Sequence, residues 1–250
     1  MRDRPLAAVL LAVLLAGLAA VPAVADDDKA HRAALLADLE AAQAQHRESP
    51  DDPAAAFDLA RAWYGLGVND DKKAAKRAEE QFDALHEAHP DEPIVIAYLG
   101  SCRLLHAKRE WAPWRKYELS KQGVTLMNDA VERAPEDRHV RFIRAATTDN
   151  LPDRFELGEQ TDADFAWLAE RIHADPTHAD LDGEQAAYAL VRHAVRLEGV
   201  ENHGDALAAY RLATELAPDS RSATEARASI ERIETFYTPA ADSASAQPAR

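Results

Sequence analysis

Few residues in this sequence have the types and spacing that chemistry at a site requires. His86 and His89 lie three positions apart near the end of a predicted helix, with Asp83 and Glu87 close by. Two imidazoles at that spacing on one helix face could ligate a metal ion. A histidine near the C-terminal end of a helix is also favoured, when charged, by the helix dipole, and this simpler explanation is the stronger one.

The remaining chemical candidates lack the neighbours that catalysis requires. His173 and His178 flank Asp175-Pro176, in a predicted turn where polar residues are expected in any case. Cys102 is the one cysteine, and no motif around it supplies a base, while its leucine neighbours predict that it is buried. The sequence contains no nucleophile elbow, no HExxH helix, no phosphate-binding glycine loop and no CxxC pair. We therefore expect no catalytic residue, no metal site and no cofactor, and we predict that the chain is not an enzyme.

The segment 106–118 has the composition of an interaction site. It holds two of the four tryptophans, Trp111 and Trp114, together with Tyr117. The same segment carries four cationic side chains: Lys108, Arg109, Arg115 and Lys116. Aromatic side chains beside arginine on a surface are typical of hot spots in protein interfaces. The alternative is that the tryptophans pack this segment onto the fold as a small satellite core, since most large aromatic side chains are buried.

Composition limits the class of protein. The 250 residues include 29 Lys and Arg against 44 Asp and Glu, for a net charge of −15, which argues against a nucleic-acid binder. Hydrophobic residues at 47% and charged residues at 29% fit a folded chain, and only 9 glycines favour helix. A single cysteine excludes a disulfide framework.

The first 25 residues have the order of a secretory signal peptide. Arg2 and Arg4 precede an apolar run over residues 6–21, and Ala23-Val24-Ala25 then precedes three aspartates. An uncleaved membrane anchor is the alternative, but a span needs roughly 20 apolar residues. We therefore expect cleavage after Ala25 and a periplasmic or secreted protein without stable membrane insertion.

Five prolines divide the rest of the chain at nearly even intervals. Pro50, Pro90, Pro135, Pro176 and Pro218 are 40, 45, 41 and 42 residues apart, and four of them are followed directly by Asp or Glu. Proline just past a helix end stops that helix, and an acidic residue is favoured at the start of the next one. A repeat of about 42 residues with two helices in each is typical of an α-solenoid.

The last of these repeats resembles the tetratricopeptide repeat (TPR). Its matching positions, in chain order, are Leu190, His193, Ala194, Leu197, Ala206, Tyr210, Ala213 and Pro218. The first repeat matches with Ala56, Leu59, Ala60 and Trp63 in one helix, and with Ala78, Phe82, Leu85 and Pro90 in the next, after about five extra residues. The second repeat matches with Leu99, Gly100, Gly123, Met127, Ala130 and Pro135 around an insertion of about eleven residues. The third repeat departs most, and the pattern does not fix its register.

The resemblance implies an all-α, TPR-like fold of about four helix pairs with capping helices. Residues 27–48 and 220–237 have amphipathic spacing and are the expected caps, so we predict one repeat domain over residues 26–237. From residue 238 to residue 250 the composition predicts a disordered tail.

The resemblance also implies a concave groove lined by the first helix of each pair, where such repeats commonly bind peptides. Carried onto this chain, the groove would be lined by Phe57, Arg61, Tyr64, Tyr98, Ser101, Leu105, Tyr188 and Arg192. We therefore predict an exported, non-enzymatic scaffold that binds a peptide or protein partner through this groove or through the Trp-rich insertion. The alternative is a periplasmic component that captures a small ligand or a cell-wall fragment.

Overall fold

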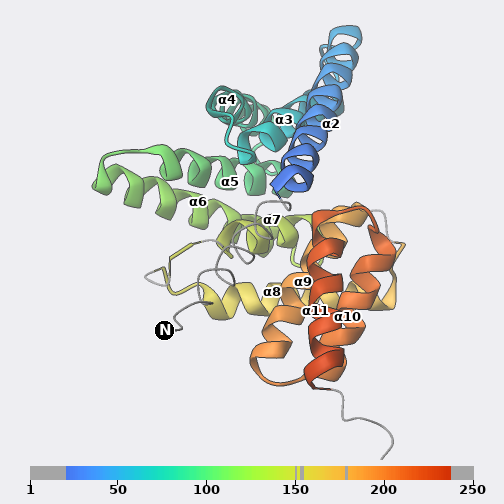
Figure 1. The fold of residues 1–250 in the computed structure, drawn as a ribbon. Coiled ribbons are helices and arrows are strands. Elements are labelled where there is room, and N and C mark those ends of the chain that lie inside the picture. Colours follow the sequence, from blue (N-terminus) through green and yellow to red (C-terminus); the bar gives the residue numbers. More distant parts are fainter. Residues whose placement is uncertain (1–20, 150, 153–154, 178–179, 238–250) are drawn as a thin grey trace, which may run out of the picture. The chain divides into compact units, whose positions relative to one another are not determined.

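The structure, a computed structural model, describes residues 21–149, 151–152, 155–177 and 180–237 (Figure 1). Within these residues the chain forms ten α-helices and no strand. The predicted all-α fold is confirmed. The helices are α2 (Val21–Glu48), α3 (Pro53–Val68), α4 (Lys72–Ala88), α5 (Pro93–Arg109), α6 (Pro113–Arg133), α7 (Arg138–Thr148), α8 (Gly158–Ala174), α9 (Gly183–Gly199), α10 (His203–Leu216) and α11 (Arg221–Phe236).

The predicted repeat boundaries coincide with linkers between helices. The five spaced prolines lie in the connections α2–α3, α4–α5, α6–α7, α8–α9 and α10–α11. The helices therefore form the four pairs α3–α4, α5–α6, α7–α8 and α9–α10. The helix α2 precedes these pairs and α11 follows them, as expected for the two caps.

Local capping fixes where the helices begin. The Asp52 carboxylate accepts a hydrogen bond from the Ala54 backbone N–H, and proline occupies the first turn of α3. Asp71 caps α4 in the same way, through the backbone N–H groups of the second and third residues that follow it. Asp182 and Gln185 form a reciprocal capping box at the start of α9. These local signals place the helix starts where the repeat pattern requires them.

The chain divides into two compact units at His89 and Pro90. The first unit contains α2, α3 and α4, and its core joins Leu39 and Ala42 of α2 to Leu59 and Leu66 of α3. The helices α3 and α4 approach closely, because a Cβ atom added at Gly67 would lie 2.7 Å from the Ala75 Cα. The single domain expected over residues 26–237 stays a prediction.

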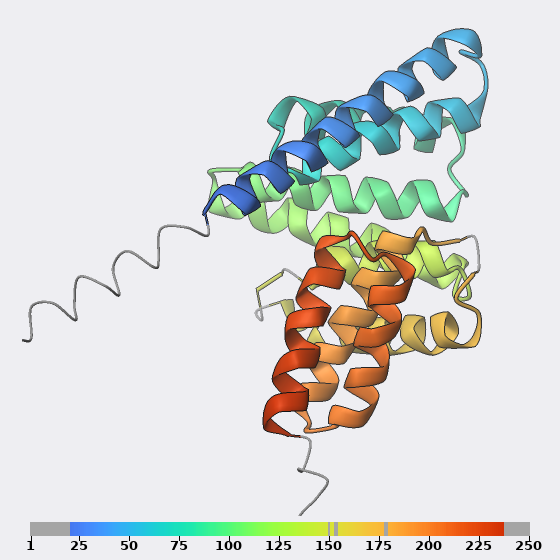
Figure 2. The same cartoon turned by 45° about the vertical axis from the view of Figure 1, so that its right-hand side comes forward.

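The second unit contains α5 to α11, with consecutive helices packed against one another. The helices α9, α10 and α11 all contact each other and lie side by side in both views (Figure 2). Its largest fully buried side chains include Tyr98, Met127, Phe165, Leu190 and Tyr210. The small residues at matching positions of the last repeat, Ala194, Ala206 and Ala213, are fully buried.

The expected insertions are helical extensions rather than loops. In the second repeat the extra residues lengthen the two helices, to 17 residues in α5 and 21 in α6, and only Glu110–Ala112 connects them. In the first repeat, α4 is 17 residues long and follows a short connection. Most of the segment 106–118 is therefore helical. Ala107 continues the buried face of α5, and Leu119 and Gly123, one turn apart, lie on the face of α6 that packs inward.

The third repeat owes its irregularity to a short first helix. The helix α7 has only 11 residues, and the 17-residue α8 starts at Gly158 after a long connection. The predicted signal sequence lies outside the described residues up to residue 20, and α2 begins at Val21. The predicted tail, residues 238–250, lies outside them as well.

Candidate interaction surface

The base of the α5–α6 hairpin is held by two glycines that face each other. A Cβ atom at Gly100 would lie 2.7 Å from the carbonyl oxygen of Gly123, and one at Gly123 would lie 2.5 Å from the carbonyl oxygen of Gly100. Backbone contact this close is possible only without side chains at both positions. The two helices therefore run against each other at their crossing, and this fixes the direction in which the hairpin extends.

A carboxylate shapes the turn at the end of this hairpin. Glu110 Oε1 accepts a hydrogen bond from the Ala112 backbone N–H at 3.1 Å. This bond lowers the pKa of Glu110, with further help from the Trp111 backbone N–H and from the nearby Arg115 and His106. Pro113 then begins α6 at a position where no backbone N–H is needed. The turn is thus fixed by local bonds, and Trp111 sits at its centre.

Three aromatic side chains are exposed at this end of the hairpin. Trp111 is 85% exposed, Trp114 69% and Tyr117 55%. The two indole rings meet edge to face, with centroids 6.3 Å apart at 72°. We call these three residues, with the turn Glu110–Ala112, the aromatic tip. Because both tryptophans are exposed, the interpretation of this segment as a satellite core is wrong.

Tyr117 also joins the aromatic tip to the connection between α7 and α8. Its ring stacks on that of Phe155, with centroids 6.1 Å apart and an interplanar angle of 19°. One face of Tyr117 is therefore occupied, and more than half of the side chain stays accessible. This contact braces α6 beyond its crossing with α5.

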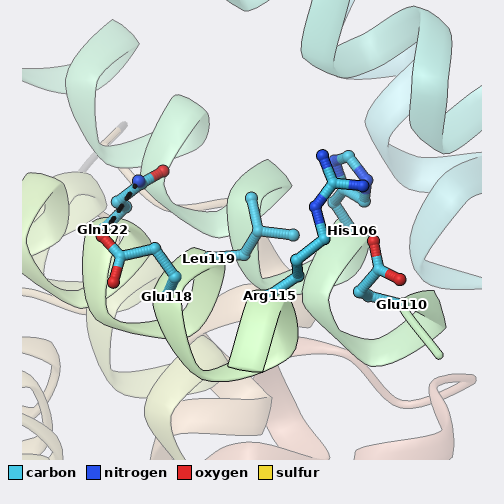
Figure 3. A pocket seen from close by; sticks show the side chains of 6 residues that line it. All are labelled: His106, Glu110, Arg115, Glu118, Leu119 and Gln122. Carbon is cyan, nitrogen blue, oxygen red and sulfur yellow. Dashed lines mark hydrogen bonds between the residues drawn. The ribbon is translucent and has the colours of Figure 1, made fainter. Parts of the chain in front are cut away.

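A pocket of about 480 Å³ opens beside the aromatic tip, between α5 and α6 (Figure 3). Polar side chains dominate its lining, with Leu119 as the apolar member: His106, Glu110, Arg115, Glu118, Leu119 and Gln122. In Figure 3 Gln122 donates a hydrogen bond to Glu118 at one end of the pocket, and His106, Glu110 and Arg115 lie toward the other end. Most of the surface that these side chains turn toward the pocket is nevertheless apolar, with a few polar groups among it.

Two of the predicted groove residues are inaccessible. Tyr98 is 2% exposed, and its hydroxyl lies 3.0 Å from His139 Nε2 of α7. Ser101 is 1% exposed, and its Oγ lies 2.9 Å from the Thr147 Oγ1. The expectation that these two side chains contact a partner is therefore wrong, because they are used to pack α5 against α7.

The other three predicted groove residues of the second unit are half-buried, and two of them already have partners. Tyr188 donates a hydrogen bond to Asp149 at 3.4 Å, and Arg192 pairs with Glu225 of α11. Leu105 is half-buried on α5. These contacts join neighbouring helices, so they leave little polar surface for a partner.

In the first unit, two of the three predicted groove residues remain reachable. Arg61 is exposed and lies 3.6 Å from Asp58, one turn away on the same helix. Tyr64 is half-buried on α3. Phe57 packs its ring edge to face against Phe82, with centroids 5.9 Å apart, and belongs to the helix packing.

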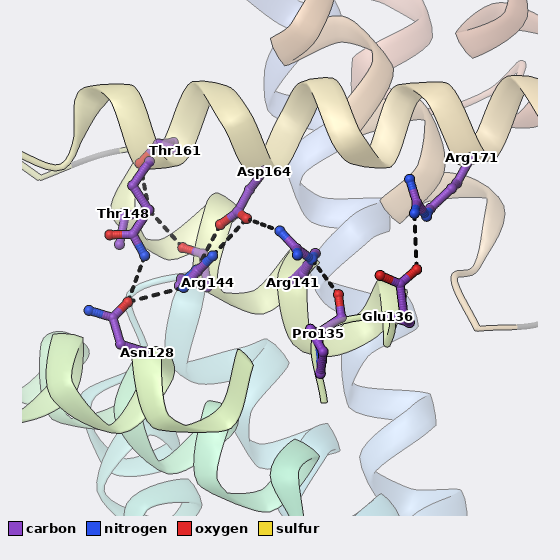
Figure 4. Close-up of polar contacts among 10 residues, drawn as sticks. Asn128, Pro135, Glu136, Arg141, Arg144, Thr148, Thr161, Asp164 and Arg171 are labelled. Carbon is purple, nitrogen blue, oxygen red and sulfur yellow. Dashed lines mark hydrogen bonds and ion pairs between the residues drawn. The ribbon is translucent and has the colours of Figure 1, made fainter. Parts of the chain in front are cut away.

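A buried ion cluster that the sequence analysis did not identify joins α7 to α8 (Figure 4). Asp164 of α8 is 1% exposed and accepts two hydrogen bonds from Arg144, at 2.7 and 2.8 Å, and one from Arg141 at 2.9 Å. Arg144 also reaches Asn128 of α6 at 3.2 Å. Two guanidinium groups thus neutralise one buried carboxylate, which otherwise would be costly to bury. The sequence offered two signals for this cluster: an aspartate within the apolar stripe of one predicted helix, and two arginines one turn apart in the segment before it.

Next to this cluster, a tryptophan is held between two arginines. The Arg141 and Arg171 guanidinium carbons lie 4.4 and 3.6 Å from the ring centroid of Trp167. Arg171 also pairs with Glu136 at 2.9 Å (Figure 4). These contacts account for a third tryptophan of the chain as part of the α7–α8 packing.

The histidines considered as metal ligands and the cysteine considered as a nucleophile occupy ordinary positions in the helical fold. His89 ends α4, where its backbone N–H bonds to the Leu85 carbonyl, and His86 lies in the last turn of that helix. Cys102 is a free thiol, 1% exposed. His178 lies outside the described residues. Within the described ranges, no group of three or more metal-ligating side chains comes together.

Comparison with known proteins supports the fold assignment. No family model matches the chain, and no curated protein matches it. The chain is similar to the crystal structure of a thermophilic TPR protein from Thermus thermophilus, with a TM-score of 0.55. The two sequences are 18% identical, and the match covers 79% of this chain and 89% of that chain. At this identity the likeness concerns the fold, and it confirms that the chain is TPR-like.

Proposed function

We propose that this chain is a protein-interaction module whose partner docks on the aromatic tip. TPR-like folds generally act as non-enzymatic scaffolds for protein partners, because stacked helix pairs offer extended surfaces without a catalytic cleft. The observation that carries this proposal is the exposure of Trp111 and Trp114, at 85% and 69%. Tryptophan, tyrosine and arginine dominate the binding energy of protein interfaces, and Arg115 follows Trp114 directly beside the tip.

The tip is favoured over the groove for a physical reason. Most of the groove positions predicted in the second unit are buried or already bonded to neighbouring helices, and binding there would first have to break those bonds. At the tip, burial of the tryptophan pair requires no such loss. The turn is also fixed by the bonds of Glu110, so little conformational entropy is lost when a partner docks.

Site-specific photo-crosslinking in the native host tests the location of the partner. A benzophenone amino acid replaces Trp111 in one variant, Arg61 in a second, and Val200 in a third as an exposed apolar control. We expect a reproducible protein adduct at position 111 that is absent at position 200. An adduct at position 61 alone would place the partner in the groove of the first unit instead. No protein adduct at any position, with the variants folded, would refute the proposal.

Double substitution of the tryptophans provides the energetic test. Trp111→Ala with Trp114→Ala should leave the melting temperature nearly unchanged, because exposed side chains contribute little to stability. The same variant should weaken binding of the crosslinked partner by at least about 2 kcal/mol, or roughly 30-fold in Kd. Equal binding by the variant would show that the adduct reflects proximity rather than recognition.

A small-ligand binding component is the second candidate, and the pocket beside Arg115 is the observation that favours it. Its surface is mostly apolar with a few polar groups from carboxylate, amide, imidazole and guanidinium side chains, which suits a cell-wall saccharide or peptide fragment that has an apolar face. A ligand that binds only the folded state raises the melting temperature with the logarithm of its concentration. Muropeptide fragments that shift the wild type but not Arg115→Ala would favour this candidate.

The compartment also belongs to the proposal. We propose export to the periplasm or the exterior, on the basis of the basic, apolar and Ala23-Val24-Ala25 order of the first 25 residues. No helix among the described residues is long and apolar enough to cross a membrane. Mass spectrometry of the mature chain checks the proposal: an N-terminus at Asp26 supports it, and a full-length cytoplasmic chain starting at Met1 contradicts it.

A further inference from the structure

The residues around the aromatic tip carry a net charge of opposite sign to that of the whole chain. Between positions 108 and 121 there are five cationic side chains and only two glutamates, although the net charge of the chain is −15. The cationic side chains are Lys108, Arg109, Arg115, Lys116 and Lys121. They belong to the end of α5 and the beginning of α6, on both sides of the exposed tryptophans.

The neutralising groups nearby are partly committed to other bonds. The Glu110 carboxylate accepts the N–H bonds that shape the turn, and the electrostatic attraction of Arg115 and His106 acts on the same group. The ion pairs of α6 lie at its other end, where Arg133 meets Asp91 and Asp129 at 2.9 and 3.0 Å. Of these five cations, Arg115, Lys116 and Lys121 belong to α6, and they outnumber the two glutamates of the segment, so a net positive charge remains on this side of the aromatic tip.

We infer that the segment bound at the aromatic tip is acidic and carries an aromatic or aliphatic side chain that packs on the Trp111–Trp114 pair. This inference rests on the proposed function and specifies the chemistry of its partner. Carboxylates of the segment would pair with Arg115, Lys116 and Lys121 of α6, while the apolar side chain covers the indole rings. The acidic remainder of the chain repels such a segment, so encounters are steered to the tip.

An anionic membrane surface is the competing occupant, because tryptophan and lysine also favour lipid headgroups. Two features favour a peptide segment over a membrane. Glu110 and Glu118 line the pocket beside the tip and would face a continuous layer of anionic headgroups, whereas a peptide can place its carboxylates over the cations alone. The pocket itself is a concave site with Leu119 in its lining, which suits a single side chain rather than a flat surface.

Fluorescence anisotropy with designed probes separates these occupants. Two short fluorescein-labelled peptides share the same Phe and Leu residues, and one has Glu and the other Lys at all remaining positions. Vesicles of phosphatidylcholine, with and without phosphatidylglycerol, serve as lipid probes in a sedimentation assay. The protein variants are Arg115→Glu with Lys116→Glu at the tip, and Lys72→Glu with Lys73→Glu in α4 as a control of equal net charge.

We expect the Glu peptide to bind the wild type and the α4 control, with an affinity that falls as salt is raised. The tip variant should lose at least about tenfold in affinity and most of the salt dependence. Trp111→Ala with Trp114→Ala should lose affinity and keep the salt dependence, because it leaves the cations in place.

Three outcomes would overturn the inference. The Lys peptide could bind as well as the Glu peptide, or neither peptide could bind the folded wild type. Tryptophan-dependent binding to phosphatidylglycerol vesicles that exceeds peptide binding would assign the tip to lipid. The proposed function fails separately, when crosslinking at position 111 finds no protein, so a protein adduct that maps to a neutral or basic segment refutes this inference alone.

Discussion

Substitution of Gly123 by alanine tests the close approach of α5 and α6. The new Cβ atom would lie 2.0 Å from Leu104 Cδ1 and 2.5 Å from the Gly100 carbonyl oxygen. Leu104 can relieve the first contact by rotation of its side chain, but the carbonyl oxygen belongs to the backbone of α5. The helices must therefore separate by roughly 1 Å, which loses dispersion contact along their interface.

The expected loss of stability follows from two opposing effects. Overpacking of this kind costs about 1–3 kcal/mol, and the backbone contact places Gly123→Ala in the upper part of that range. Replacement of glycine by alanine inside a helix returns about 1 kcal/mol through helix propensity. We expect a net loss of about 1–2 kcal/mol, which lowers the melting temperature by roughly 2–8 °C for a unit of this size.

Differential scanning calorimetry of three glycine variants measures this effect. Gly100→Ala should resemble Gly123→Ala, because its Cβ atom would meet the Gly123 carbonyl oxygen at 2.7 Å. Gly204→Ala in α10 is the matched control, since its Cβ atom would meet nothing within 4 Å, and it should add about 0.4–1 kcal/mol. The reasoning is refuted when Gly123→Ala melts at or above the wild type while Gly204→Ala is stabilised as expected.

Three further predictions concern the polar contacts. Asp164→Ala leaves two guanidinium groups without their buried carboxylate and should cost about 3–5 kcal/mol by urea unfolding. Asp71→Ala removes the N-cap of α4 and should cost about 1 kcal/mol, whereas Asp71→Asn, which retains a cap oxygen, should cost much less at neutral pH. Burial would raise the pKa of Glu198, but hydrogen bonds from Arg232 and Tyr210 outweigh it and lower that pKa. This contribution to stability is present above the ordinary glutamate pKa and is lost as pH falls below it, so Glu198→Gln should flatten the acid limb of a melting-temperature profile.

The repeat boundaries could be predicted from the sequence because the signals that mark them are local. Proline after a helix end and an acidic cap before the next helix act within a few residues, and all five spaced prolines lie in linkers between helices. Asp52 and Asp182 lie in such linkers and cap the helices that follow them. Ala194 and Tyr210, which match the repeat pattern, are buried. Helix starts and ends that depend on residues adjacent in the sequence can be predicted without knowledge of the tertiary structure.

The candidate site was predicted only in part, because accessibility is a property of the assembled helices. Tyr98 and Ser101 have residue types that suit a groove, but their hydroxyl groups bond to side chains of α7 that are 41 and 46 residues away in the sequence. Trp111 and Trp114 were identified as distinctive, yet exposure could not be decided from composition. The pairing of Asp164 with the arginines of α7 spans 20 and 23 residues and has no fixed spacing.

The contacts of α6 explain why an exposed aromatic pair can serve recognition rather than only adding mobile apolar surface. Gly123 fixes α6 against α5, Asn128 ties it to Arg144 of α7, and Tyr117 stacks on Phe155 nearer the tip. Three attachments along one helix restrict its bending and so hold the backbone that carries Trp114. A partner that covers the pair then gains the burial of two indoles and loses little backbone entropy at this end of the hairpin. Loosening the base by Gly123→Ala should therefore weaken binding at the tip as well as stability, even though no atom of the tip is changed.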